Sequence, residues 1–283
     1  MSLDLGAVGR RTPRTTCRWD SRDAMLYALA VGAGQQDPYA DLAFTTENTA
    51  GTSQHVIPTF AAVLTDFGAG AGPDIGRIDM TRLVHAEQSV ELLRPLPASG
   101  TLEVSTEVTG IYDKGSGALV VTESSGWLPD DDTEPSVRTR SSVFIKDAGG
   151  FGTLAPRISW SAPPRQPDIV LDSGSRTDQA LLYRLTGDRN PLHSDPDFAS
   201  RAGFEKPILH GMCTFGIVGR VLLNELCGGD PARFSSMSAR FSQPVLPGDP
   251  LTVHAWHDEH GVTFRVSSHE GIVMDRGSMI FRP

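Results

Sequence analysis

The stretch GMCTFGIVGRVLL, from Gly211 to Leu223, determines how the second half of the chain is organised. It is apolar apart from one charge on Arg220, which is the pattern of a helix that packs on a sheet. The segments that follow alternate between apolar and polar residues or are rich in β-branched residues, at 238–245, 251–256, 262–266 and 277–282. We therefore expect one long helix wrapped by antiparallel strands.

The first half of the chain repeats this pattern, with a helical opening, an apolar helix and then strands. Two short matches support a duplication, because Tyr27 and His55 correspond to Tyr183 and His210 at nearly equal offsets. Residues rich in proline and glycine separate the halves. The sequence predicts an α+β protein with two repeats, residues 1–155 and 156–283. The strand-like segments of the first half are 87–93, 100–108, 118–123 and 140–145.

Two shorter helices are expected before the long one. The first covers residues 177–186 and ends at Gly187, since glycine favours the backbone conformation that closes a helix. The second begins after Ser194, whose hydroxyl is suited to cap a helix, with Pro196 tolerated in the first turn. The residues between the two helices are therefore expected to form a bent loop.

The composition excludes several classes of function. The 283 residues carry a formal net charge of −9, which argues against a nucleic-acid partner because such proteins need a basic face. The sequence has no signal-peptide pattern and no apolar run of bilayer length, so we expect a cytoplasmic protein with no membrane partner. Cys17, Cys213 and Cys227 are odd in number and widely spaced, which suggests neither a disulfide framework nor a thiolate zinc site.

The densest polar cluster is YRLTGDRNPLHSDP, residues 183–196. Because Gly187 and Pro191 interrupt a helix, Asp188 and His193 lie on the bent loop, where a carboxylate and an imidazole can converge on one water. Such a pair can remove and deliver a proton near neutral pH. The alternative interpretation is that Asp188 is a turn residue and that His193 bonds to the helix that follows.

A second motif, KPILHGMCTF at residues 206–215, leads into the long helix. Gly211 is expected in the first turn, where a free backbone N–H and the helix dipole suit the negative charge that develops on a thioester oxygen. Glycine has no Cβ and lets a carbonyl approach closely. The alternative is a glycine that serves helix–sheet packing alone.

These motifs resemble the hydratase 2, or MaoC-like, family of (R)-specific enoyl-CoA hydratases with the double hot-dog fold. The resemblance rests on residues 183–193, on His210-Gly211-Met212 and on ARFSQPVLPGD at residues 239–249. Weaker similarity, including LAFTTEN at residues 42–48, extends it over most of the chain.

The resemblance implies roles for individual residues. Asp188 and His193 match the residues that bind and activate water, Asn190 supports them, and Gly211 matches the oxyanion donor. We also expect four substrate-binding residues, His210, Arg240, Phe241 and Gly248. Arg240 is a candidate contact for CoA phosphates, although an arginine that covers an apolar strand is the alternative.

The implied reaction is the reversible addition of water to a trans-2-enoyl-CoA, giving the (3R)-3-hydroxyacyl-CoA. No cofactor and no metal are implied. The partner is an acyl-CoA, or an acyl chain on a carrier protein, and the chain is expected to form a homodimer. His254, His257 and His260 are evenly spaced, but an alternating strand and a turn would separate them, so we interpret them as surface residues.

Two other functions are compatible with the fold. An acyl-thioesterase is one, because fold does not decide function, and a non-catalytic acyl-thioester binding module is the other. A thioesterase does not require the combined set of Asp188, Asn190, His193 and Gly211. A binding module is expected to have an incomplete site, which applies to the first half of the chain and not to the second.

The first half is predicted to be non-catalytic and to accommodate the acyl chain. In the repeat alignment, Ala33 takes the place of Asp188 and Val56 that of Gly211. Two glycine-rich segments, 32–34 and 68–72, are expected to leave space for a long or bulky acyl group. The alternative is that this half completes the fold by covering a sheet edge and an apolar helix.

Overall fold

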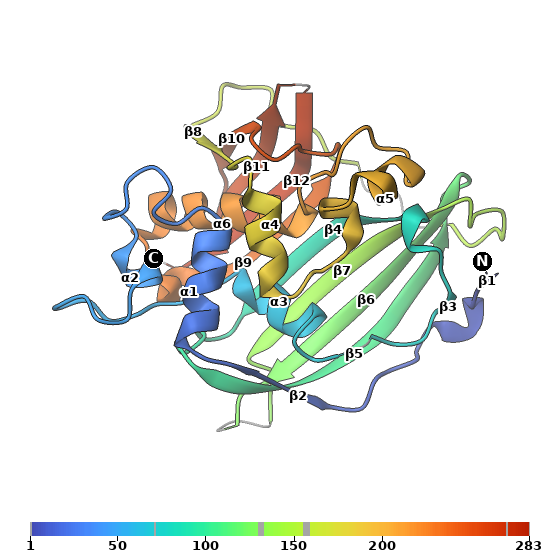
Figure 1. Ribbon diagram of the computed structural model, residues 1–283, viewed down its shortest axis with the longest axis horizontal. Helices are drawn as coiled ribbons and strands as arrows, with labels where there is room; N and C mark the ends of the chain where they lie inside the picture. Colours follow the sequence, from blue (N-terminus) through green and yellow to red (C-terminus); the bar gives the residue numbers. More distant parts are fainter. Residues whose placement is uncertain (1, 71, 130–132, 155–158, 270, 283) are drawn as a thin grey trace.

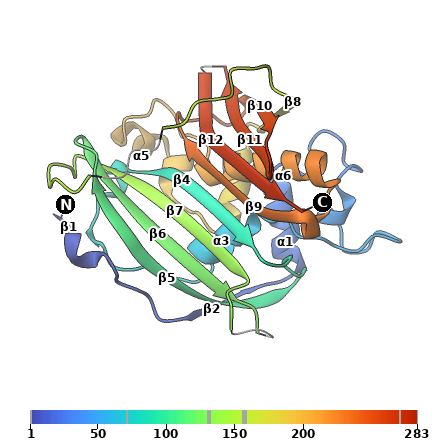
Figure 2. The same cartoon turned by 180° about the vertical axis from the view of Figure 1, so that it is seen from behind.

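The computed structural model describes residues 2–70, 72–129, 133–154, 159–269 and 271–282 (Figure 1). Its centre is a ten-stranded antiparallel sheet, with helices packed on one face. Figure 2 shows the opposite face, on which the strands lie in front of the helices. The α+β class predicted from the sequence is confirmed. The predicted boundary at residue 155 lies outside the described residues.

The two halves of the sheet have the same strand order, β2-β5-β6-β7-β4 followed by β9-β12-β11-β10-β8. If the five strands of each half are numbered in chain order, both half-sheets read 1-3-4-5-2 from the outer edge to the middle of the sheet. The predicted repeat is therefore present in the topology. The strands are β2 (Thr15–Trp19), β4 (Leu83–Leu92), β5 (Gly100–Asp113), β6 (Gly117–Trp127), β7 (Val137–Lys146), β8 (Ile169–Gly174), β9 (Phe234–Phe241), β10 (Pro250–His257), β11 (Gly261–Ser268) and β12 (Gly271–Phe281).

Strands β4 and β9 join the halves into one sheet. Five residue pairs hold this junction, from Glu87 opposite Arg240 to Glu91 opposite Ser236. The two edge strands, β2 and β8, are not among the strands predicted from the sequence. Each has at most six residues, too few for alternation of polar and apolar residues to stand out. A separate two-stranded sheet pairs β1 (Ser2–Leu3) with β3 (Gly76–Arg77).

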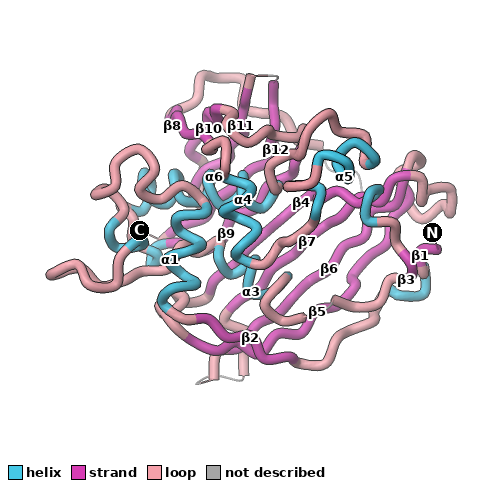
Figure 3. Tube along the Cα trace, viewed as in Figure 1, coloured by secondary structure: helices cyan, strands magenta, loops and turns pink. Residues whose placement is uncertain are grey.

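The helices gather on one face of the sheet, as the cyan segments of Figure 3 show. Helix α3 contacts strands of the first half, and α6 contacts β8, β9 and β4. No helix in the described part of the chain has both the length and the apolarity needed to span a membrane. The helices are α1 (Ser21–Ala30), α2 (Leu42–Thr45), α3 (Phe60–Asp66), α4 (Gln179–Tyr183), α5 (Pro196–Arg201) and α6 (Gly211–Cys227).

Helix α6 is the long central helix predicted from residues 211–223, and it continues for another turn to Cys227. Gly228 ends it in the left-handed conformation, with φ of 62°. Gly216 lies where α6 crosses the end of α1: a Cβ there would be 2.5 Å from a methyl group of Val31. The first-half counterpart, α3, has seven residues and begins at Phe60.

The N-terminal cap predicted for α5 needs a correction. Asp195 caps this helix in place of Ser194, because the Asp195 carboxylate accepts hydrogen bonds from the backbone N–H groups of Asp197 and Phe198. A carboxylate also interacts favourably with the positive end of the helix dipole, which a hydroxyl does to a smaller extent.

A buried ion pair links the two halves beside α6. Nη1 of Arg220 lies 3.3 Å from Oδ2 of Asp41, and both side chains are nearly inaccessible to solvent. The Asp41 carboxylate also accepts hydrogen bonds from the backbone N–H of Gly34 and from the side-chain amide of Asn224. These contacts bring the loop after α1 against the second-half helix. Removal of either charge would leave the other buried without its counter-ion.

We expect Asp41→Ala to lower the free energy of unfolding by about 3–5 kcal/mol, as is typical when a buried pair loses one partner. Urea unfolding, followed by circular dichroism, measures this loss. Asp178→Ala is the matched control, since Asp178 pairs with Arg176 on the surface, where both side chains are about half exposed. That control should change stability by about 0–1 kcal/mol. Equal losses in the two variants would contradict the role of the Asp41–Arg220 pair.

Candidate active site

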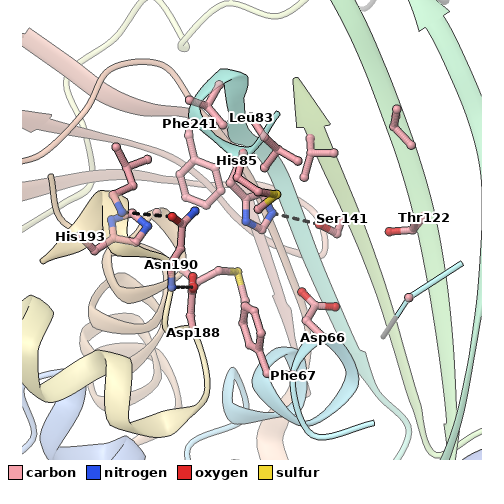
Figure 4. A pocket seen from close by; sticks show the side chains of 18 of the residues that line it. Asp66, Phe67, Leu83, His85, Thr122, Ser141, Asp188, Asn190, His193 and Phe241 are labelled. Carbon is pink, nitrogen blue, oxygen red and sulfur yellow. Dashed lines mark hydrogen bonds between the residues drawn. The ribbon is translucent and has the colours of Figure 1, made fainter. Parts of the chain in front are cut away.

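A cavity of about 740 Å³ lies between the sheet, the end of α3 and the beginning of α6. Its volume is within the range of small-molecule binding sites. Both halves of the chain line it: strands β4 to β7 and the loop after α3 come from the first half, and residues 188–193, the start of α6 and residues 241–245 come from the second. Figure 4 shows polar groups from both halves pointing into this space.

The loop that carries Asp188 is shaped by its own side chains. Gly187 has φ of 144°, which favours glycine, and its backbone lies against Phe67. The Asp188 carboxylate then accepts a hydrogen bond from the backbone N–H of Asn190 at 3.1 Å. Asn190 in turn accepts one from the N–H of Leu192 at 3.0 Å. These two bonds, drawn as dashed lines in Figure 4, place Asp188, Asn190 and His193 on one wall of the cavity.

A backbone carbonyl fixes the protonation pattern of His193. Nδ1 of this histidine lies 2.8 Å from the carbonyl oxygen of Ile208. A carbonyl accepts and never donates, so Nδ1 carries the proton and the lone pair of the neutral ring is on Nε2. Burial lowers the pKa of His193, while the charge of Asp188 acts in the opposite direction. The ring is therefore neutral near pH 7, with Nε2 able to accept a proton.

His210 lies behind this pair, which corrects its predicted role as a substrate contact. It is buried and does not line the cavity. Its ring stacks on that of His193 with a centroid distance of 3.7 Å, and its Nε2 donates to the carbonyl oxygen of Asp188 at 3.2 Å. Burial, together with the neighbouring His193, lowers the pKa of His210 to about 2. We therefore describe His210 as a neutral positioning residue for Asp188 and His193.

Asp188, His193 and His210 bring potential metal ligands within 4.8 Å of one another. An ion bound to both imidazoles would have to lie in the plane of each ring at about 2.0–2.1 Å from nitrogen. The rings are stacked with only 28° between their planes, so no point satisfies both conditions. The geometry of this cluster therefore favours acid–base chemistry over metal binding.

Gly211 supplies a backbone N–H at the cavity wall. It is the first residue of α6, where N–H groups have no partner within the helix, and its own N–H has no partner among the described residues. A Cβ on this residue would be 3.4 Å from the ring of Phe241, which also lines the cavity. Gly211 and Phe241 thus lie side by side on the cavity wall.

Arg240 and Gly248 are not among the described residues that line the cavity. The guanidinium group of Arg240 pairs with Asp275 on the neighbouring strand, with Nε 2.7 Å from Oδ1. This ion pair links β9 to β12. The positive charge that was predicted to meet CoA phosphates is therefore already paired with Asp275. Gly248 has φ of 99° and donates its N–H to Ser175, so a turn explains this glycine.

Two cavity residues of the first half, Asp66 and His85, were not predicted from the sequence. Burial raises the pKa of Asp66 to about 7, and the negative charge of Asp188 adds to the effect. Burial lowers the pKa of His85. Neither residue belongs to a local motif. The sequence offered two weak indications of them: Asp66 ends an apolar run, and His85 is a polar residue within a strand pattern.

The sequence matches two known domain families in succession. Residues 18–147 match the MFE-2 hydratase 2 N-terminal domain, and residues 160–274 match the MaoC like domain. The chain is 43% identical over 296 residues to the 3-hydroxyacyl-thioester dehydratase Y of Mycobacterium tuberculosis, covering 99% of this chain and 98% of that protein. It is 34% identical to the peroxisomal enoyl-CoA hydratase 2 of Arabidopsis thaliana, covering 93% and 90% of the two chains.

A solved structure gives the same assignment. The crystal structure of a MaoC-like dehydratase from Phytophthora capsici aligns with a TM-score of 0.85 and 32% identity, over 99% of this chain and 98% of that one. The double hot-dog fold expected from the resemblance is confirmed by this match and by the two repeats of the sheet. The chain belongs to the family of hydratase 2 and MaoC-like dehydratases.

Proposed function

We propose that the protein catalyses the reversible hydration of trans-2-enoyl-CoA to (3R)-3-hydroxyacyl-CoA. The observation that carries the proposal is the convergence of Asp188, His193 and the free N–H of Gly211 on one cavity. Relatives named 3-hydroxyacyl-thioester dehydratase and enoyl-CoA hydratase support it. An acyl chain on a carrier protein would undergo the same reaction, because the thiol carrier takes no part in it.

In the proposed reaction, a water lies between the Asp188 carboxylate and Nε2 of His193. This pair takes one proton from the water while the oxygen bonds to C3 of the substrate. Negative charge moves to the thioester oxygen, where the N–H of Gly211 and the dipole of α6 stabilise it. A proton returned to C2 completes the addition, so the elements of water are added without net loss or gain of protons.

A thioesterase and a non-catalytic binding module are both less consistent with the site. A thioesterase breaks the bond between carbonyl carbon and sulfur and needs no water directed at C3. A binding module needs no proton acceptor with a fixed tautomer, whereas Nδ1 of His193 is held in one protonation state by Ile208. Release of free thiol from an enoyl-CoA would indicate a thioesterase. The homodimer and the cytoplasmic location remain predictions.

We expect Asp188→Asn and His193→Gln each to lower kcat by roughly 10²–10⁴-fold, the usual effect of losing a positioned acid or base. The loss of absorbance of crotonyl-CoA measures the rate. Asn at position 188 can still accept the hydrogen bond from the N–H of Asn190, so the loop should keep its shape.

The double variant should be little slower than either single variant, because both groups act on the same water. His254→Gln is the matched control, since this histidine bonds to Ser267 and does not line the cavity. Near-normal turnover in Asp188→Asn or His193→Gln, or an equal loss in the control, would disprove the assignment.

We expect Gly211→Ala to lower kcat by roughly 10²-fold, because a methyl group would displace the carbonyl from its N–H donor. The protein should stay folded, since the new Cβ meets Phe241 at an ordinary contact distance of 3.4 Å. Gly216→Ala is the control: its Cβ clashes with Val31, so it should lower the melting temperature without a comparable loss of kcat per folded molecule. A normal kcat in Gly211→Ala would remove the oxyanion role.

The first half is proposed to accommodate the acyl chain, with one correction to the residues involved. The loop at 68–72 lines the cavity through Ala69, Gly70 and Gly72. Residues 32–34 do not; Gly32 lies beside Arg220, and Gly34 bonds to Asp41. That segment therefore serves the junction between the halves.

We expect Ala69→Leu to reduce hydration of trans-2-dodecenoyl-CoA at least tenfold more than hydration of crotonyl-CoA, because the larger side chain fills the cavity beyond the reacting carbons. The values of kcat/KM for the two substrates measure this selectivity. Ala61→Leu is the control, since Ala61 is fully buried outside the cavity. Its effect should be the same for both chain lengths and follow stability. Equal losses of kcat/KM for both substrates in Ala69→Leu would indicate that the first half only completes the fold.

A further inference from the structure

The sheet face that forms the cavity floor carries a polar row across four adjacent strands. The row consists of Thr106 on β5, Thr122 on β6, Ser141 on β7 and His85 on β4. Thr122 and Ser141 are directly opposite each other in the register of β6 and β7. The cavity residues two positions away on the same strands are apolar: Val104, Val120, Val143 and Leu83. The row therefore crosses an otherwise apolar surface.

The hydrogen bonds within this row leave donor capacity directed at the cavity. Nε2 of His85 lies 3.0 Å from the carbonyl oxygen of Glu87 and 3.1 Å from Oγ of Ser141. Because the carbonyl can only accept, Nε2 carries the proton, and Ser141 accepts from it as well. The hydroxyl hydrogen of Ser141 is then free to donate. The hydroxyl of Thr122 has no hydrogen-bond partner in the part of the chain that the structure describes.

Asp66 faces this row from the end of α3. The neighbouring Thr65 is anchored to the sheet through a hydrogen bond of 2.8 Å to Thr139, which is two residues before Ser141 on β7. The Asp66 carboxyl group points into the cavity (Figure 4). Within the described residues its one hydrogen-bond contact is the Thr65 hydroxyl at 3.5 Å, the outer limit for such a bond. The Asp66 carboxyl group, which can accept a hydrogen bond, thus lies opposite the hydroxyl groups of Ser141 and Thr122 on the sheet.

The polar groups of the row are half-buried, and an alkyl chain laid over them would remove them from water without giving them a new hydrogen bond. Valine in place of Thr122 would suit an alkyl chain better at the same size. A hydroxyl group on the ligand both donates and accepts, so it can bond to Asp66 and to Ser141 or Thr122 at once. Thr122 is two strands from His85, or about 10 Å at the usual strand spacing. His85 in turn packs against Phe241 at the reaction end, with ring centroids 5.1 Å apart.

We propose that Asp66, Ser141 and Thr122 form a specificity subsite for a hydroxyl group on the acyl chain, beyond the carbons that react. This inference rests on the proposed function, because it assumes that the thioester lies at Gly211 and the acyl chain extends over the first half. The subsite selects among acyl thioesters and takes no part in the addition of water.

The test uses saturated acyl-CoA thioesters, which have no double bond to hydrate. Isothermal titration calorimetry compares the Kd of each chain from hexanoyl to dodecanoyl with that of its ω-hydroxylated counterpart. We expect one or more lengths to bind about tenfold more tightly when hydroxylated, the usual effect of one added hydrogen bond in a buried site. Equal Kd values at every length would overturn the proposal and indicate that water alone occupies the polar row.

Two variants locate the effect. Thr122→Val, which preserves side-chain size, and Asp66→Leu should each bring the ratio of the two Kd values close to one. Glu123→Gln is the matched control, since Glu123 is the next residue of β6 and pairs with Arg140 on the exposed face. A ratio that persists in Thr122→Val and Asp66→Leu would overturn the assignment. Hydration of trans-2-decenoyl-CoA is measured separately, so a binding preference without hydration would disprove the proposed function and not the subsite.

Discussion

The pairing of β4 with β9 is the contact on which the rest of the site depends. Five residue pairs join two similar half-sheets edge to edge, and α3 and α6 then cover one continuous surface. His85 on β4 and Phe241 on β9 meet at this junction, where the cavity opens between the helices. Without the pairing, each half would expose an unpaired strand edge and an apolar helix, and the reacting groups of the second half would face solvent.

The two halves share a strand order and differ in what their connecting segments do. Between its first and second strands, the second half places a loop that directs Asp188 and His193 at the cavity and a helix that begins with Gly211. At the same stage the first half places a shorter helix that ends in Asp66, followed by a glycine-containing loop. The shared topology encloses the cavity, and these two connections place different side chains on its wall: Asp188 and His193 from the second half, Asp66 from the first.

The parts of the site that depend on neighbouring residues could be predicted from the sequence. Gly187, Asp188, Asn190 and Pro191 shape one loop through contacts two residues apart, so their pattern in the sequence indicates their geometry. Asp66 and His85 reach the same cavity through strand pairing and helix packing, which leave no local pattern. The Arg240–Asp275 pair joins residues 35 positions apart, and its formation determines whether the arginine is available to a ligand. Apart from the cap at Asp195, each predicted role that the structure corrects is explained by such a contact with a residue outside the local motif.

Burial and backbone carbonyls together give this site a proton acceptor at neutral pH. An exposed histidine has a pKa near 6.5, so a fraction is protonated in the physiological range. Burial lowers the pKa of His193, His210 and His85, and it raises that of Asp66, so each shift favours the uncharged form of a group in the cavity wall or directly behind it. The carbonyl of Ile208 then places the proton of His193 on Nδ1. In the proposed reaction, the N–H of Gly211 and the dipole of α6 would stabilise a negatively charged thioester oxygen most strongly where the surroundings are weakly polar.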